Sequence, residues 1–215
     1  MRFERQHDLL SQEKLAEQRI LIIGVGAVGR QVAISLAAMG AKNIRICDMD
    51  IVDESNIATQ AYPSQDVGQK KVVSLIKTMR SLDHEANSSF MEDGEAWNPR
   101  RYIDYNPTIV FSCVDRMDVR RSIFLFCKKN GTPLFLDGRM LAEMGHVFCY
   151  DSTDIDGYES TLFTDEQALQ GRCTARGTLY MANILANLMV GKMSLSLRGL
   201  KDSNKYTYNI VGELM

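Results

Sequence analysis

The fold of this chain is decided by Gly24-Val25-Gly26-Ala27-Val28-Gly29, which follows the apolar run ILII at residues 20–23. An apolar strand that ends in G-x-G-x-x-G and opens a helix is typical of the nucleotide-binding corner of a doubly wound α/β sheet. Gly24 permits the tight turn, Gly26 lets the backbone approach a phosphate, and Gly29 lets helix and strand pack closely. The N–H groups at the start of the helix favour an anion. The motif alone therefore predicts a nucleotide site without specifying the chemistry.

The composition limits the classes of protein to which this chain can belong. Its 215 residues are enough to bury a hydrophobic core in one domain. The net charge of −2 and the lack of a basic stripe argue against a nucleic-acid partner. No apolar run is long enough to span a bilayer and no signal peptide is apparent, so we expect a cytoplasmic protein without membrane contact. Five scattered cysteines without a C-x-x-C pair fit a reducing compartment and exclude a zinc site built from paired knuckles.

Short apolar runs alternate with helical repeats, which predicts an α/β protein with a doubly wound, largely parallel sheet and helices on both faces. We expect strands at residues 19–23, 43–48, 88–91, 108–112, 133–137, 145–150 and 206–211. We expect helices at residues 27–39, 72–79, 119–127 and 174–190. A polar helical arm is predicted at residues 2–18, and a long polar connection before Gly68. The helix at 174–190 is apolar on nearly every side, so it should be buried or lie at a subunit interface.

Three short segments follow the glycine motif in close order: DMDIV at 48–52, SNIATQ at 55–60 and VGQKKV at 67–72. RQ at 5–6 precedes QEKL at 12–15, and SCVD at 112–115 ends a later predicted strand. With these segments the chain resembles the ThiF/MoeB/HesA superfamily, whose fold is shared with ubiquitin-activating enzymes. The resemblance extends from Arg2 to about Val190.

The resemblance implies an adenylyltransferase that uses ATP and Mg²⁺ to activate the C-terminal glycine of a ubiquitin-like or sulfur-carrier protein, or of a peptide. It also implies a homodimer and a single Rossmann-like adenylation domain over residues 1–215. Within that domain we expect the helical arm at 1–18 and the nucleotide-binding core at 19–150. A partner-facing loop, the apolar helix and the last strand are expected at 151–215.

Adenylation requires charge compensation and in-line positioning more than proton transfer. The glycine loop supplies N–H groups, and Lys71 is predicted to supply a mobile positive charge for phosphate. Asp115 is predicted to bind Mg²⁺, which prefers one or two carboxylates together with phosphate oxygens. Asp48, at the end of the second strand, suits the ribose hydroxyls.

The resemblance adds four nucleotide-binding residues: Arg5, Asp50, Asn56 and Gln60. It implies that Asn56 and Gln60 line the phosphate side, and that Arg5 reaches the nucleotide of the neighbouring subunit. One position departs from the pattern, because Thr59 stands where the family usually has arginine. Threonine cannot replace a planar charged donor, so either another arginine substitutes, with Arg139 as the candidate, or turnover is impaired.

Cys173 directly precedes the apolar helix and is flanked by Arg172 and, beyond Thr174, by Arg176. A helix N-terminus and nearby arginines favour a thiolate, and activating enzymes that pass their carrier onward form a cysteine thioester. Cys173 is therefore a candidate catalytic nucleophile, and the alternative is a small, well-packed residue. We predict that the other cysteines belong to the core: Cys47, Cys113, Cys127 and Cys149.

Three other functions remain open at this point. An NAD(P)-binding oxidoreductase would explain the glycine motif but gives no role to Asn56, Lys71 or Asp115. A non-catalytic nucleotide-binding homologue is consistent with Thr59. A relative that adenylates an RNA base is disfavoured by the acidic composition.

Overall fold

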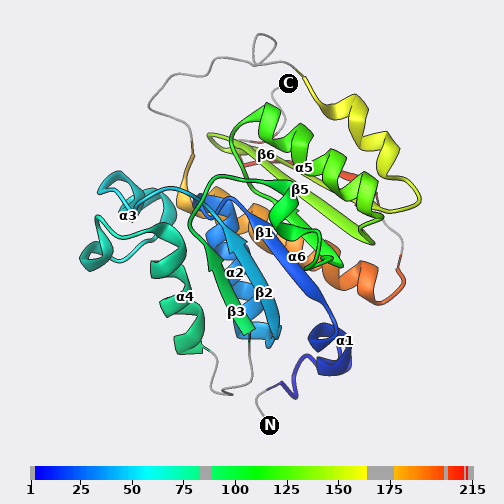
Figure 1. The fold of residues 1–215 in the computed structure, drawn as a ribbon, viewed down its shortest axis with the longest axis horizontal. Helices are drawn as coiled ribbons and strands as arrows, with labels where there is room; N and C mark the ends of the chain where they lie inside the picture. Colours follow the sequence, from blue (N-terminus) through cyan, green and yellow to red (C-terminus); the bar gives the residue numbers. More distant parts are fainter. Residues whose placement is uncertain (1–2, 83–88, 164–176, 201–202, 211, 213–215) are drawn as a thin grey trace.

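The computed structural model of the chain describes residues 3–82, 89–163, 177–200, 203–210 and 212 (Figure 1). The strands are β1 Arg19–Ile23, β2 Asn43–Cys47, β3 Ser89–Asp93, β4 Ile109–Ser112, β5 Leu134–Leu141, β6 Met144–Asp151 and β7 Lys205–Asn209. The α-helices are α1 Gln12–Ala16, α2 Ala27–Met39, α3 Ser55–Gln60, α4 Lys71–Leu82, α5 Met117–Asn130 and α6 Leu179–Leu197. Short 3-10 helices occur at η1 Ser64–Asp66, η2 Pro99–Tyr102 and η3 Ile155–Thr161.

The described strands form one seven-stranded sheet in the order β3-β2-β1-β4-β5-β6-β7. β1 pairs in parallel with both β2 and β4, and β3 and β5 extend the parallel part outward. β6 and β7 add antiparallel strands at one edge. The predicted α/β class with a largely parallel sheet is therefore confirmed. The chain leaves β1 toward β2 and later returns on the other side at β4, which creates the switch point where open α/β sheets bind ligands.

Helices cover both faces of the sheet (Figure 1). Ile20 and Ile22 of β1 pack in the cluster formed with α2, α4 and α6, whereas Leu21 and Ile23 pack in the cluster formed with α5 and η3. All four side chains are buried, because a strand covered on both faces exposes neither. α6 packs along α2 and against β5 and β6, so the predicted burial of the apolar helix is confirmed for one of its sides.

Three of the differences between the observed and the expected elements concern helices. The N-terminal arm is helical only in α1, and the residues before it form turns. The expected polar connection before Gly68 contains α3, which gave no apolar signal because none of its residues is buried. The predicted start of the apolar helix at residue 174 is wrong, because Gly177 forms a β-bridge with Ala142 and Thr178 is the N-cap of α6. The helix begins at Leu179, six residues after Cys173, and continues beyond the predicted end to Leu197. No helix in the described part of the chain is both long and apolar enough to cross a membrane.

The corner between β1 and α2 requires two of its glycines for steric reasons. Gly24 has a φ of +81°, and a Cβ there would lie 2.7 Å from the carbonyl oxygen of Cys113. A Cβ on Gly29 would lie 1.9 Å from the carbonyl oxygen of Gly24. The backbone of the loop therefore lies directly against the start of α2 and the end of β4.

A side chain at Gly29 should break this corner. We expect Gly29→Ala to lower the free energy of unfolding by at least about 2 kcal/mol, because backbone atoms must move to relieve the contact. Gly191→Ala is a matched control: Gly191 lies in α6 with no heavy atom within 4 Å of an added Cβ. This change should raise the free energy of unfolding by about 0.5–1 kcal/mol. Urea denaturation measures both, and equal stability of the two variants would contradict the packing argument.

Candidate functional site

The carboxyl ends of β1, β2 and β4 meet at one edge of the sheet, next to the glycine loop at residues 24–29. The N–H of Gly24 donates to the carbonyl oxygen of Cys47 at 2.9 Å, and the N–H of Cys113 donates to that of Ile23 at 2.8 Å. These bonds continue the pairing of the three strands beyond their ends. The residues that follow β2 and β4 therefore lie beside the loop.

Asp48 fixes the conformation of the glycine loop. Its Oδ2 accepts a hydrogen bond from the N–H of Val25 at 2.7 Å, and its Oδ1 accepts one from the N–H of Asp50 at 2.9 Å. Each carboxylate oxygen can accept a second hydrogen bond. The predicted contact of Asp48 with ribose hydroxyls is therefore compatible with its role in the loop.

Lys71 and Asp50 form an ion pair at this edge. Lys71 Nζ lies 2.9 Å from Asp50 Oδ2, and the N–H of Lys71 donates to the carbonyl oxygen of Asp50 at 2.9 Å. The Lys71 side chain is 8% exposed and that of Asp50 is 54% exposed. The Lys71 ammonium, which we predicted to be mobile, is thus held and partly neutralised by Asp50. A phosphate would have to share Lys71 with the Asp50 carboxylate or displace that carboxylate.

α3 places Gln60 next to the glycine loop. Gln60 Oε1 is buried without a hydrogen-bond partner in the described structure, and lies 3.8 Å from the position of a Cβ on Gly26. Because Gln60 Oε1 lacks a donor and lies next to the space above Gly26, it could accept a hydrogen bond from a ligand hydroxyl. With the amide group flipped, the Gln60 nitrogen would occupy this position and could donate to a phosphate. Asn56 stabilises the turn that precedes α3, because its Oδ1 accepts from the N–H of Asp53 at 3.0 Å.

Asp115 follows β4 and is exposed, and no described residue forms a hydrogen bond or ion pair with its carboxylate. The described residues contain no group of three or more His, Cys, Asp or Glu side chains placed to hold a metal. Mg²⁺ is often bound by one or two carboxylates together with phosphate oxygens. A single free carboxylate therefore fits an ion that arrives with a nucleotide.

A buried cluster of charged side chains that the sequence did not predict lies next to Asp115. Asp137 is 0% exposed; its Oδ1 pairs with Arg120, and its Oδ2 accepts from Arg139 Nε at 2.7 Å. Arg120 also donates to the carbonyl oxygen of Val114. The cluster therefore fixes the backbone immediately before Asp115. Its members come from α5 and β5, and no short motif joins them in the sequence.

Arg139 links the sheet to η3. Its Nη1 and Nη2 donate to the carbonyl oxygen and the hydroxyl of Thr161 at 2.7 and 2.8 Å. Its guanidinium lies 4.3 Å from the ring centroid of Phe148. The candidate substitute for the arginine missing at Thr59 thus has a structural role here. Thr59 itself donates its hydroxyl to the carbonyl oxygen of Ser55 within α3, at 2.8 Å.

Arg5 and Cys173 are not among the residues that meet at this edge. The arm that contains Arg5 is tied to the far end of α2, since the side chains of Gln6 and Gln12 donate to the carbonyl oxygen of Met39 at 2.7 and 3.1 Å. α2 is about 20 Å long, so the exposed Arg5 lies far from its own glycine loop. Contact with the nucleotide of a neighbouring subunit stays a prediction. Cys173 lies outside the described residues.

The described cysteines include three thiols whose pKa is raised by burial. Burial raises the pKa of Cys47 to about 11, and those of Cys113 and Cys127 to about 12. These thiols are protonated at neutral pH and should react slowly with electrophiles. Cys47 and Cys127 are buried, as predicted, whereas Cys113 and Cys149 are partly buried.

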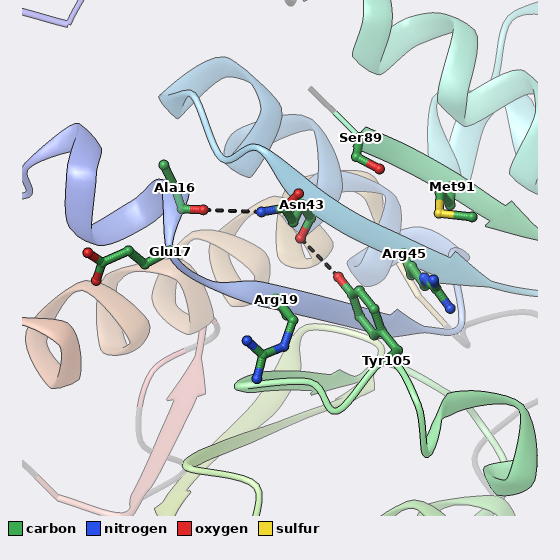
Figure 2. A pocket seen from close by; sticks show the side chains of 8 residues that line it. All are labelled: Ala16, Glu17, Arg19, Asn43, Arg45, Ser89, Met91 and Tyr105. Carbon is green, nitrogen blue, oxygen red and sulfur yellow. Dashed lines mark hydrogen bonds between the residues drawn. The ribbon is translucent and has the colours of Figure 1, made fainter. Parts of the chain in front are cut away.

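A separate cavity of about 340 Å³ lies at the opposite edge of the sheet (Figure 2). Arg19, Asn43 and Ser89, the first residues of β1, β2 and β3, line it. Tyr105 also lines the cavity and donates its hydroxyl to the carbonyl oxygen of Asn43 at 3.1 Å. Because the amino ends of parallel strands point away from the glycine loop, this cavity is not part of the candidate site.

Comparison with known proteins gives the same family over nearly the whole chain. The family model described as "ThiF family" matches residues 2–212. The adenylyltransferase and sulfurtransferase uba4 of Emericella nidulans is 32% identical over 134 residues, which cover 60% of this chain and 27% of that protein. The sulfur carrier protein ThiS adenylyltransferase of Escherichia coli is 24% identical over 185 residues, which cover 83% of this chain and 73% of that protein. A crystal structure of PaaA has the same fold, with a TM-score of 0.76 and 20% identity over 98% of this chain and 66% of that one.

Proposed function

Because this chain belongs to the ThiF family, we propose that it is an adenylyltransferase that uses ATP and Mg²⁺ to activate the C-terminal carboxylate of a carrier protein or peptide. The proposed carrier is a small ubiquitin-like or sulfur-carrier protein that ends in glycine. The activities for which the uba4 and ThiS-activating relatives are named support this proposal. The chain spans about a quarter of the uba4 relative's length, so the carrier and its onward fate are part of the proposal. The observation that best supports it is the sheet edge shared by the glycine loop, Asp48, Lys71 and Asp115.

Adenylation joins a carboxylate oxygen to the α-phosphorus of ATP and releases pyrophosphate as the bond to the β-phosphate breaks. Positioning and charge compensation govern such a step. In the proposed site the N–H groups at the start of α2 bind phosphate oxygens, and Asp48 accepts from the ribose hydroxyls. Lys71 exchanges part of its contact with Asp50 for a phosphate. Asp115 would hold Mg²⁺, which would compensate phosphate charge when bound.

The remaining predicted site residues complete this proposal. Asn56 and Gln60 would line the phosphate side from α3, and Arg5 would act across a homodimer. We propose that residues 1–215 form one adenylation domain. The described cysteines are free thiols, which supports the proposed cytoplasmic location.

Removal of the Asp115 carboxylate should stop the reaction without unfolding the protein. Asp115→Ala should reduce ATP–pyrophosphate exchange, assayed with a sulfur-carrier protein ending in glycine, by about 100-fold or more. Asp118→Ala is the matched control, because Asp118 is also exposed and its ion pair with Arg116 lies at the start of α5. This variant should keep its exchange rate. Wild-type exchange by Asp115→Ala, with an unchanged circular dichroism spectrum, would show that the metal assignment is wrong.

If Cys173 is a nucleophile, iodoacetamide at neutral pH should alkylate it well before Cys47, Cys113 and Cys127, whose pKa values burial raises. Cys173→Ala should keep pyrophosphate exchange but lose any thiol-sensitive adduct with the carrier, because adenylation precedes thiol attack. Mass spectrometry of the labelled peptides measures the order of reaction. Labelling of every cysteine only after unfolding would leave an adenylyltransferase without a thioester step.

The proposed homodimer would use the side of α6 that faces away from the sheet. Ile184, Leu188 and Leu195 are only partly covered and recur along one stripe of this helix. Sedimentation should therefore give a dimer at micromolar concentration, and Leu188→Glu should shift it to monomer. The control is Leu125→Glu, since Leu125 is an exposed leucine on α5. A monomeric wild type, or equal effects of the two variants, would contradict this interface.

A further inference from the structure

Arg30 is a buried cation in the first turns of α2, directly after the glycine loop. The residue is 5% exposed, and its guanidinium carbon lies 4.8 Å from the ring centroid of Tyr62. Nε is fully enclosed and has no hydrogen-bond partner in the described structure. No described carboxylate lies within ion-pair distance of it. Asp66 acts on it electrostatically, but the Asp66 oxygens already accept from Ser74 Oγ and Gln69 Nε2 at 2.6 and 3.0 Å.

Burial of a charge without a partner is unfavourable. The loss of hydration lowers the pKa of the Arg30 guanidinium, yet an arginine remains charged at neutral pH. An apolar residue of similar volume would pack against Tyr62 without this penalty. The buried positive charge therefore calls for an anion in addition to the more distant Asp66, and no described residue supplies one within ion-pair distance.

Arg30 is connected to the glycine loop by short contacts. The hydroxyl of Tyr62 donates to the carbonyl oxygen of Val25 at 2.7 Å, and the N–H of Arg30 donates to that of Gly26 at 3.1 Å. Side chains on a helix lean toward its N-terminus, which here is the loop. Nε is the enclosed nitrogen of the Arg30 guanidinium. Nη1 and Nη2 are therefore the nitrogens that can contact a ligand.

The other cations around the loop already have partners. Lys71 pairs with Asp50 at 2.9 Å, and Lys70 donates to the carbonyl oxygens of Met49 and Gly94 at 3.2 and 2.8 Å. A triphosphate needs more positive charge than a lysine that is already shared with a carboxylate. In the described part of this site, Arg30 is the cation whose side chain has neither a hydrogen-bond nor an ion-pair partner.

We propose that Arg30 binds a phosphate group of the nucleotide from beneath the glycine loop, with Tyr62 as the platform that holds the guanidinium. This rests on the proposed function and assigns the positive charge that Thr59 does not provide. Arg30 contributes to the binding of the charged phosphates and not to that of the adenosine.

Calorimetric titration of ATP·Mg and of adenosine tests this assignment. Arg30→Met should weaken ATP·Mg binding by about tenfold or more, the loss expected for one charge-assisted hydrogen bond. Adenosine should bind it within about twofold of the wild type. The melting temperature of the ligand-free variant should equal or exceed that of the wild type, because a buried unpaired charge has been removed. Arg30→Lys should fall between the two proteins.

The control is Arg121→Gln, which removes an exposed guanidinium from α5 and should bind both ligands as the wild type does. Unchanged ATP·Mg binding by Arg30→Met would overturn the inference. Equal losses for ATP·Mg and adenosine, with a lower melting temperature, would also overturn it, because they indicate a structural role. If Arg30→Met does not fold, Arg30→Lys serves as the test. Wild-type ATP·Mg affinity and a wild-type melting temperature of Arg30→Lys would contradict the inference that the guanidinium binds phosphate. A folded wild type that binds no ATP·Mg would instead refute the proposed function.

Discussion

The close contact of the glycine loop with the ends of β1 and β4 is the constraint on which both the fold and the candidate site depend. Gly29 lies so near the carbonyl of Gly24 that no side chain fits between them, and Gly24 itself lies against Cys113. This contact places the start of α2 beside β1, at the switch point where the chain order of the parallel strands reverses between β1 and β4. The same contact leaves the first N–H groups of α2 facing the edge at which Asp48 and Asp115 emerge. The geometry that closes the core thus also presents helix N–H groups of the kind that bind anions.

The charges at this edge are arranged for a ligand that brings its own negative charge. Asp48 is held by backbone N–H groups, and Lys71 is held by Asp50. Asp115 forms no hydrogen bond or ion pair with a described residue, so it can accept a cation, and the guanidinium of Arg30 forms none either, so it can accept an anion. A nucleotide triphosphate with a divalent ion would satisfy both groups at once. This complementarity is the physical basis for proposing adenylation over a reaction of an uncharged substrate.

The sequence predicted the elements that leave a periodic apolar signal. Strands β1, β2 and β4 and helix α2 were found within one or two residues, because burial on both faces of the sheet imposes that signal. Helix α3 was missed because it is short and none of its residues is buried, so its sequence carries no periodic apolar pattern. That Asp48 and Asp115 lie beside the glycine loop could be predicted, because strand ends of a parallel sheet meet at one edge; their roles in binding stay predictions. Contacts between distant segments, such as Arg120 with Asp137 or Arg30 with Tyr62, could not be predicted, since they depend on how helices pack on the sheet.

The most direct test of this account is a calorimetric titration of the wild-type protein with ATP·Mg and, separately, with NAD. The glycine loop by itself suits either nucleotide. Asp115 and Arg30, which form no ion pair with any described residue, favour a triphosphate with a metal ion. We therefore predict saturable binding of ATP·Mg, weakened when Mg²⁺ is removed with a chelator, and no detectable binding of NAD. Binding of NAD without binding of ATP·Mg would contradict the account.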